Sequence, residues 1–311
     1  MGQAGTDHRK RTAAAGLTPG LYGFIRAALA EDLGRGDKTS ELTVPASARA
    51  EGSFIAKSDL TVYGLAVARA VFEAHTEVDA PGDKGQGDIV FTQHVPDGEA
   101  VRAGTVLAGI EGPARGILGA ERVALNLIMR LSGVATLTAR FVAEVAGTGA
   151  KVTDTRKTTP GLRALEKAAV LAGGGTNHRS GLDDGVLVKD NHIAIAGGVG
   201  RAVRLAKTGA PHLLKVEVEV EDEAGLYEAI SAGADAVLLD NMTPEEVAGC
   251  VCIVRRERPE TVVEVSGNIG LHNIRLYGET GPDLISVGAL THSATAADIS
   301  LKLMPKTSGS L

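Results

Sequence analysis

Residues 152–192 hold the most concentrated set of side chains in this sequence that could bind a charged ligand. Basic residues stand there beside glycines and turn formers, and they outnumber the acidic residues six to five in a chain whose formal net charge is −6. They are Arg156, Lys157, Arg163, Lys167, Arg179 and Lys189. A local positive excess in an acidic protein predicts a site for a small polyanion rather than general affinity for nucleic acid or membrane.

Two pairs within this segment carry most of the predicted chemistry. Arg156 and Lys157 follow a β-rich run that ends at Asp154, so they are expected where a strand opens into a loop. His178 and Arg179 follow three consecutive glycines, which let the backbone approach a ligand closely. An arginine fork suits a carboxylate, and the histidine adds a donor. The alternative is that the glycines only end a helix and the cations form a solvated face.

Composition limits the class of protein. Hydrophobic residues make up 44% of the 311 residues, but aromatic residues only 3% with no Trp, so the core must consist of Ala, Val, Leu and Ile. The two cysteines, Cys250 and Cys252, rule out a disulfide scaffold and a Cys-rich zinc site. No run of about 18 apolar residues occurs, so we expect no membrane span and a cytoplasmic location.

The elements that position these side chains follow a repeated rhythm after residue 150. Short β-rich runs alternate with amphipathic segments of helical length, which predicts a parallel sheet with right-handed crossovers. Six or seven such units favour an incomplete (β/α) barrel over a doubly wound sheet. The runs are 151–154, 185–189, 213–219, 235–239, 261–265 and 283–287, and helices are expected at 162–172, 199–208, 222–232, 244–257 and 271–279.

The part of the chain before residue 125 has a different sequence pattern. Residues 1–17 are small and polar and are expected to form a disordered tail. Residues 18–124 combine helical segments with short strands and glycine turns, which predicts a smaller α+β domain. The fold class is therefore α/β, with the barrel over residues 125–292. Residues 293–305 are expected to pack on the N-terminal domain.

Each predicted barrel strand ends in a chemically useful group. In a parallel barrel these ends gather at one rim, where the active sites of this architecture are built. The last two runs end in small-residue loops, where such barrels commonly bind a phosphate. The groups are Asp154 with Arg156 and Lys157, then Lys189, Glu219, Asp240, the Ser266, Gly267 and Asn268 loop, and the Gly288 and Ala289 loop with His292.

Two features leave alternatives open. Glu219 and Asp240 end neighbouring runs, and they could share Mg²⁺, act as an acid–base pair, or form an ion pair with Lys189. Arg122 begins a polar stripe that recurs every four residues along a predicted helix at 117–141, and this stripe could be solvated or could contact a partner.

Taken together, the motifs resemble the quinolinate phosphoribosyltransferase family. The resemblance extends to about residue 303 and departs at the N-terminal extension, at Gly278 and Pro282, and at Asn268, where many relatives carry glycine. The motifs are EDLGRGDKTS at 31–40, ERVALNLIMRLSGVAT at 121–136, TDTRKTTPGLR, GGGTNHR, VKDNHI, VEVEVE, LLDNM, VSGNI and ISVGALTHSA.

The resemblance implies synthesis of nicotinate mononucleotide from quinolinate and phosphoribosyl pyrophosphate, with release of pyrophosphate and CO₂, in NAD biosynthesis. It also implies Mg²⁺ and a homodimer in which Arg122 enters the neighbour's site. Close rivals are an enzyme of the same architecture acting on another aromatic anion, and a binding module without turnover.

The resemblance assigns roles residue by residue. Arg156, His178 and Arg179 bind the quinolinate carboxylates, Lys157 and Lys189 lie between substrate and phosphates, and Glu219 and Asp240 face Mg²⁺ and the ribose. Lys157, Lys189, Glu219 and Asp240 are the expected catalytic residues. The 5′-phosphate loops comprise Ser266, Gly267, Asn268, Gly288 and Ala289, with Thr155, Val287 and His292 as further substrate contacts.

Overall fold

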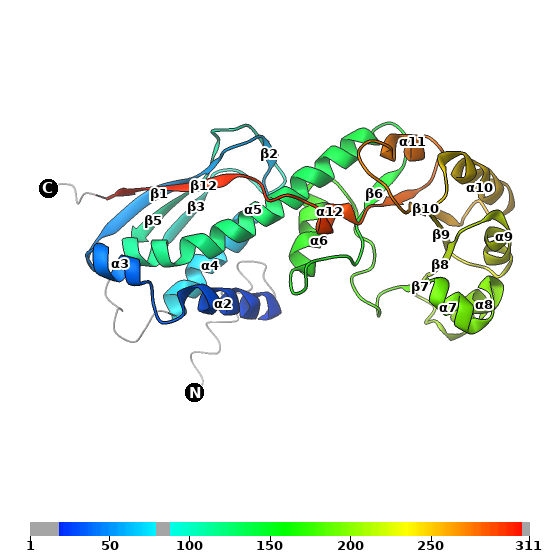
Figure 1. Cartoon of the computed structure of the whole chain (residues 1–311), viewed down its shortest axis with the longest axis horizontal. Helices are drawn as coiled ribbons and strands as arrows, with labels where there is room; N and C mark the ends of the chain where they lie inside the picture. Colours follow the sequence, from blue (N-terminus) through cyan, green and yellow to red (C-terminus); the bar gives the residue numbers. More distant parts are fainter. Residues whose placement is uncertain (1–18, 79–87, 307–311) are drawn as a thin grey trace. The chain divides into compact units, whose positions relative to one another are not determined.

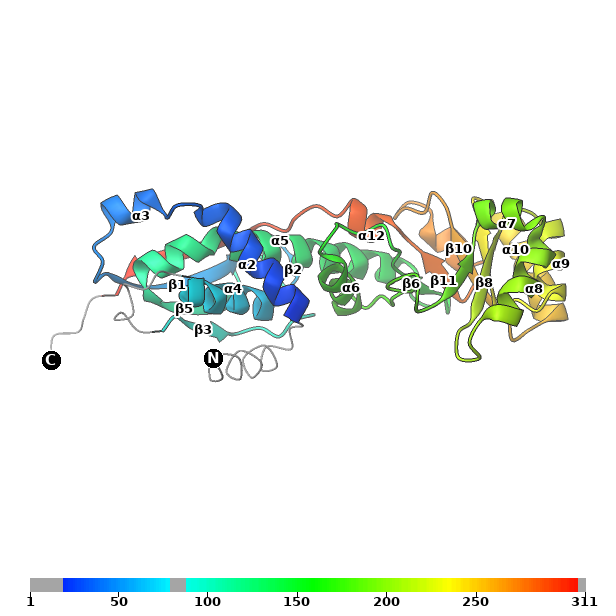
Figure 2. The same cartoon turned by 90° about the horizontal axis from the view of Figure 1, so that it is seen from below.

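The computed structural model describes residues 19–78 and 88–306, which fall into two compact units. The first unit contains the chain up to Thr136 and again from Thr295, and the second is Leu137–Ala294 (Figures 1 and 2). The division falls inside one continuous helix, whereas the sequence placed a domain boundary after residue 124. The expected tail, residues 1–17, lies outside the described residues.

The first unit is built on an antiparallel sheet with the strand order β12-β1-β5-β3. Strand β12 (Ile299–Pro305) pairs along its whole length with β1 (Arg49–Ala56), from Ala50 opposite Pro305 to Ala56 opposite Ile299. Residues 299–305 therefore return to the sheet of the first unit. The remaining strands are β5 (Val106–Pro113), β3 (Val90–Gln93) and a two-stranded pair, β2 (Leu60–Thr61) with β4 (Ala100–Val101).

Four helices complete the described part of the first unit. They are α2 (Pro19–Leu33), α3 (Lys38–Thr43), α4 (Leu65–Val78) and the long helix α5 (Ala114–Glu144). Few aromatic residues are available for the core, and three of them meet there. Phe54 lies 6.1 Å from Phe72 and 5.5 Å from Phe91 between ring centroids. The sequence did not predict α3, which is capped by Asp37 accepting a hydrogen bond from the Ser40 N–H (3.0 Å).

The second unit contains six parallel strands in the order β6-β11-β10-β9-β8-β7, which confirms the predicted incomplete barrel. The first strand pairs with the last, as in a closed barrel, but β6 and β7 do not pair with each other within residues 88–306. The strands are β6 (Lys151–Thr153), β7 (Val186–Val188), β8 (Val216–Val220), β9 (Ala236–Asp240), β10 (Val262–Ser266) and β11 (Leu284–Ser286).

A single residue extends the sheet beyond β6. Thr176 forms an isolated parallel bridge to Thr153, and its N–H donates to the Val152 carbonyl (2.8 Å) on the edge of β6 that does not face β11. This bridge brings the chain that follows the three glycines back to the start of the barrel. It therefore fixes the start of the segment that carries His178 and Arg179.

Helices cover the outer side of the strands, as Figure 1 shows for α8, α9 and α10. The capping box of α10 explains why that helix has its predicted bounds: Thr243 accepts from the Glu246 N–H (3.3 Å), and Glu246 accepts from the Thr243 N–H (2.8 Å). The helices are α6 (Arg163–Ala172), α7 (Asp190–Ala196), α8 (Val199–Gly209), α9 (Glu223–Ser231), α10 (Pro244–Glu257), α11 (Ile274–Gly278) and α12 (Ala289–His292).

Hydrophobic side chains of the strands fill the interior of this unit. Val216, Val218, Leu239, Val263 and Val265 are all buried, in keeping with the aliphatic core that the composition predicts. Across the described residues, no helix has the length and hydropathy that a membrane span requires. The cytoplasmic location stays a prediction.

Candidate active site

A cavity of 520 Å³ lies at the carboxyl ends of the barrel strands in the second unit. That volume is in the range of sites that enclose a small ligand. It brings together every predicted site residue except Arg122. They are Thr155, Arg156, Lys157, His178, Arg179, Lys189, Glu219, Asp240, Ser266, Gly267, Asn268, Val287, Gly288, Ala289 and His292.

The loop after β6 carries Arg156 and Lys157 on one wall of the cavity. The Thr291 hydroxyl donates to the Lys157 carbonyl (2.9 Å), which ties this loop to α12. A Cβ at Gly288 would lie 3.1 Å from the Lys157 side chain and 3.2 Å from that of His292. Glycine therefore makes room for both side chains where the second small-residue loop meets the cations.

Lys167 and Asp154 belong to the 152–192 segment but do not line the cavity. Lys167 and Asp154 are buried and lie 2.5 Å apart, and the Lys167 ammonium also donates to the His178 carbonyl (2.8 Å). The same Asp154 oxygen accepts from the His178 N–H (2.9 Å). The pair thus fixes the backbone that carries His178. The sequence counted Lys167 among the basic residues of the polyanion site, and this is wrong because burial and pairing leave it no access to a ligand.

Arg163 also bonds to other parts of the protein and does not line the cavity. Its guanidinium donates to the Thr158 hydroxyl (2.9 Å) and to the Ser180 carbonyl (3.0 Å), which joins the loop after β6 to the loop after Thr176. Arg179 donates to the Gly185 carbonyl (2.9 Å) while it lines the cavity. Arg156, Lys157, Arg179 and Lys189 are therefore the cations of the segment that line the cavity.

The Glu219 carboxylate forms an ion pair with the Lys189 ammonium, one of the alternatives left open by the sequence. Asp240 accepts a hydrogen bond from its neighbour Asn241 (2.6 Å). Both acidic side chains line the cavity and offer carboxylate oxygens, the ligands that Mg²⁺ prefers. They fit the predicted magnesium ion, whose binding stays a prediction.

The loop after β10 has the backbone that its small residues predict. Gly267 has φ 94° and Asn268 has φ 52°, a left-handed region that favours glycine and that asparagine tolerates better than most residues. A Cβ on Gly267 would lie 2.3 Å from the Asn241 side-chain oxygen. Asn268 donates to that oxygen (3.2 Å), so the loops after β9 and β10 are joined. The departure at Asn268 therefore keeps the loop conformation.

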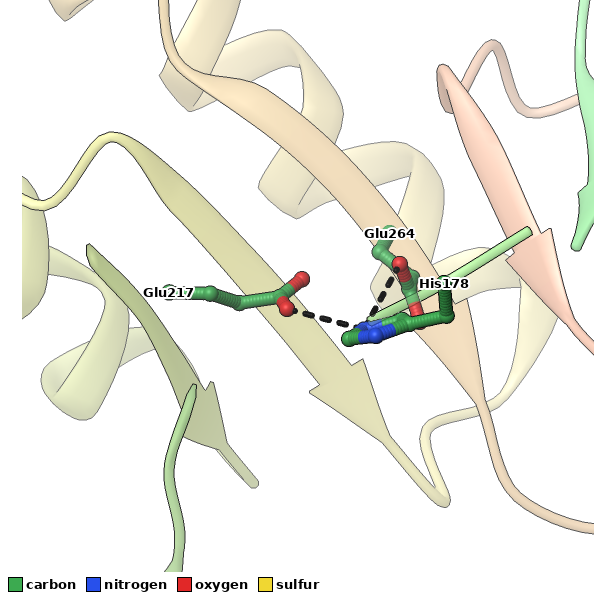
Figure 3. Close-up of side chains that lie close together, drawn as sticks. All are labelled: His178, Glu217 and Glu264. Carbon is green, nitrogen blue, oxygen red and sulfur yellow. Dashed lines mark hydrogen bonds and ion pairs between the residues drawn. The ribbon is translucent and has the colours of Figure 1, made fainter. Parts of the chain in front are cut away.

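A cluster of the buried Glu264 with the half-buried His178 and Glu217 was not predicted (Figure 3). The two carboxylates point toward the imidazole from β8 and β10. His178 Nε2 lies 3.0 Å from a Glu217 oxygen and 3.7 Å from a Glu264 oxygen. The first distance is an ordinary hydrogen bond, so a shared proton explains the spacing. The sequence signal was available, because acidic residues alternate with valines inside both β runs.

The surroundings of this cluster raise the pKa of two of its members. Burial, together with the charge of Glu217, raises the pKa of Glu264 to about 7. The hydrogen bond to Glu217 raises the pKa of His178, but His178 Nδ1 accepts the Arg179 N–H (2.7 Å). A second proton on the ring would displace that contact, so the tautomer that fits carries its proton on Nε2. Both ring nitrogens are thus engaged within the protein.

The remaining walls were also not predicted. Leu187, Leu238 and Ile269 add apolar surface suited to a planar ring, and Asn241, Glu264 and Ser286 add polar atoms. Arg122 lies on α5 in the first unit, exposed beside the buried residues Val123 and Ala124. It is not among the residues that line the cavity. Its role in a neighbouring subunit stays a prediction.

In the second unit, cations, carboxylates and small-residue loops lie together at the carboxyl rim of an open parallel barrel. This arrangement defines a class of protein, one that binds a phosphorylated anion. Comparison with known proteins identifies which one: the chain belongs to the quinolinate phosphoribosyltransferase family. The family's N-terminal domain model matches residues 37–132, and its C-terminal domain model matches residues 134–302. The resemblance seen in the motifs is confirmed.

Individual relatives agree with the family match. The chain is 42% identical over 272 residues to the probable nicotinate-nucleotide pyrophosphorylase [carboxylating] of Bacillus subtilis, covering 87% of this chain and 89% of that protein. It is 42% identical to the Mycobacterium leprae nicotinate-nucleotide pyrophosphorylase [carboxylating], over 90% of this chain and 95% of that one. The crystal structure of NadC from Streptococcus pyogenes matches with a TM-score of 0.85 at 37% identity, over 94% and 99% of the two chains.

Proposed function

We propose that this protein transfers the phosphoribosyl group of phosphoribosyl pyrophosphate to quinolinate and removes one carboxylate, giving nicotinate mononucleotide, pyrophosphate and CO₂. The observation that carries the proposal is the single cavity in which four cations, two rim carboxylates and two small-residue loops meet. A ligand with two carboxylates and a phosphorylated sugar needs each of these features. The activity in the names of the family and of the relatives supports the same reaction.

Recognition of quinolinate falls on Arg156 and Arg179. Both guanidinium groups line the cavity, and each offers the planar fork that suits a carboxylate. His178 has both ring nitrogens engaged, so it shapes the floor beneath the ring rather than donating freely to a carboxylate. The resemblance implies that Arg156, His178 and Arg179 all bind the carboxylates, and we propose that the two arginines do so while His178 shapes the site.

The transfer step needs positioning and charge neutralisation. The pyridine nitrogen itself attacks the sugar carbon as pyrophosphate leaves, so no protein nucleophile is required. Lys157 and Lys189 supply positive charge beside the departing phosphates, and the loops at Gly267 and Gly288 receive the 5′-phosphate. Mg²⁺, held by Glu219 and Asp240 partly through water or substrate, would neutralise pyrophosphate charge.

The proposed assembly is a homodimer in which Arg122 completes the partner's cavity. Its exposed place on α5 leaves the guanidinium available for a neighbour. We predict that Arg122→Ala folds normally and loses activity, and that mixing it with inactive Lys157→Ala chains restores part of that activity, because one of the two sites in a mixed dimer is then intact. The check is an activity assay on mixtures in which dimers are verified by differential tags. Verified mixed dimers without recovery would contradict the shared site.

The direct test of function is incubation with quinolinate, phosphoribosyl pyrophosphate and Mg²⁺. CO₂ and nicotinate mononucleotide should form with quinolinate and not with nicotinate, the matched substrate that lacks the second carboxylate. Turnover of another aromatic anion alone would favour the rival enzyme of the same architecture. Retained ligand binding without any turnover would favour a binding module.

A further inference from the structure

We propose that Glu264 is the acid that protonates C2 of the pyridine ring after the carboxylate has left. The inference rests on the proposed function and adds a catalytic residue to it. Three observations support it: the place of Glu264 in the cavity, its lack of a hydrogen-bond partner at one oxygen, and the charges that surround it.

The reaction requires one proton at this carbon. Once the ring nitrogen carries the ribose, the bond between C2 and the carboxylate breaks, its electron pair stays on C2, and CO₂ leaves. C2 then takes a proton from the Glu264 carboxyl group, and Glu264 becomes a carboxylate. Water that enters after the product leaves restores the proton. Solvent water is thus the only further reactant, and every atom and electron pair is accounted for.

Glu264 occupies a suitable place for this step. It stands on β10, lines the cavity and is only 1% exposed. Its Oε1 is buried and has no hydrogen-bond partner among the described residues. Its other oxygen lies 3.7 Å from His178 Nε2, beyond ordinary hydrogen-bond distance. Within the part of the chain that the structure describes, the Ser286 hydroxyl is the one donor to this carboxyl group besides the distant imidazole. An ionised carboxylate buried with so few donors would be costly, so the geometry itself favours the protonated form.

The acids elsewhere in the cavity are held differently. Glu219 is ion-paired with Lys189, and Asp240 accepts from Asn241. Glu217 accepts the His178 proton at 3.0 Å, so it carries the negative charge of the cluster. Glu264 is left as the carboxyl group of the cluster that holds a proton. The arrangement matches two neighbouring carboxyl groups of which only one ionises.

The groups that face Glu264 come from several elements. Burial and Glu217 on β8 raise the pKa of Glu264, whereas His178, the Ser286 hydroxyl on β11 and Lys189 after β7 lower it. The net pKa is about 7. A bound dianionic pyridine would add negative charge nearby and raise that pKa further. The added charge therefore favours the protonated acid when the substrate is in place.

The test compares Glu264→Gln with the wild type and with Glu245→Gln, the same change at an exposed position on α10. Single-turnover reactions would follow pyrophosphate and CO₂ separately. Glu264→Gln should release pyrophosphate within about threefold of the wild-type rate but release CO₂ roughly 10²-fold more slowly, a typical contribution of a positioned acid. The phosphoribosylated dicarboxylate should then accumulate and be detected by mass spectrometry. Glu245→Gln should match the wild type.

The pH dependence of the wild-type protein tests the inference without relying on the folding of the variant. Because the protonated acid is required, the CO₂ step should be fast below the pKa of Glu264 in the complex. It should slow about tenfold per pH unit above that pKa. Pyrophosphate release should not follow this limb. A CO₂ step that does not slow at high pH would overturn the proposal.

Other outcomes separate this inference from the proposed function. Equal CO₂ release by wild type and Glu264→Gln would overturn the role of Glu264 alone. Loss of both pyrophosphate and CO₂ release in a variant with wild-type melting temperature would also overturn it, since the residue would then serve substrate binding. A wild-type protein that releases neither product would overturn the proposed function and this inference with it.

Discussion

Two groups of charged residues that lie within fifteen positions of each other in the sequence have opposite surroundings in the second unit. Lys167 and Asp154 are buried and bond to each other and to the His178 backbone. Arg156 and Lys157 are exposed and line the cavity. The comparison teaches that density of charge locates the region of a site, whereas burial and pairing decide which charges serve the ligand and which hold the backbone.

The buried member of this comparison should show the largest effect on stability. Lys167→Ala would leave Asp154 as an uncompensated buried charge, so we expect the free energy of unfolding to fall by about 3–5 kcal/mol. The matched control is Lys207→Ala, which breaks an ion pair with Asp235 in which both side chains are about one-third exposed. That change should cost less than about 1 kcal/mol. Urea denaturation of both variants is the measurement, and equal losses would contradict the distinction.

The exposed member should affect activity instead. Lys157→Ala removes a positive charge from beside the proposed pyrophosphate site, so kcat/KM should fall by roughly 10²–10³-fold. The melting temperature should stay close to that of the wild type, because Lys157 is exposed.

The control for this change is Lys151→Ala. This lysine is exposed at the opposite end of β6, and its loss should leave kcat/KM unchanged. A Lys157→Ala variant that unfolds more easily but turns over normally would reverse the assignment of the two groups.

A smaller effect should appear where glycine makes room for the exposed cation. Gly288 has φ −62°, so alanine is compatible with its backbone, but the added methyl group would lie 3.1 Å from the Lys157 side chain. Displacing that side chain should reduce kcat/KM by about tenfold. Gly249→Ala on α10 is the control, since a Cβ there meets nothing within 4 Å. Steady-state kinetics with varied phosphoribosyl pyrophosphate would check the effect, and equal activity of the two variants would refute it.

The sequence predicted the six parallel strands because each β-rich run is bounded by turn formers and separated by a helix of readable period. It predicted α10 with its bounds because the capping residues Thr243 and Glu246 are local signals. It did not predict α3, α7 or α12, which have 6, 7 and 4 residues and are too short to display a helical period. Two of them start at local caps: Asp37 accepts the Ser40 N–H at α3, and His192 accepts the Lys189 N–H at α7.

The candidate site likewise has one part that the sequence predicted and one part that it did not. Residue types at strand ends were enough to place Lys189, Glu219 and Asp240 on one rim, because parallel strands bring their carboxyl ends together. The cluster of His178, Glu217 and Glu264 was not foreseen, although His178 and Glu217 stand in motifs of the family and Glu264 directly precedes another. Strand alternation places two side chains on one face, but it does not say whether that face meets a histidine from a distant loop.

By itself, the sequence determined the barrel, the family and the side chains that the cavity would need, since these depend on local periodicity and on motifs read in order. Only the tertiary structure decided which charges are paired and buried, as in Asp154 with Lys167, and which buried carboxyl oxygen lacks a hydrogen-bond partner, as in Oε1 of Glu264. The physical reason is that solvation and pairing energies depend on neighbours brought together from strands and loops far apart in the chain.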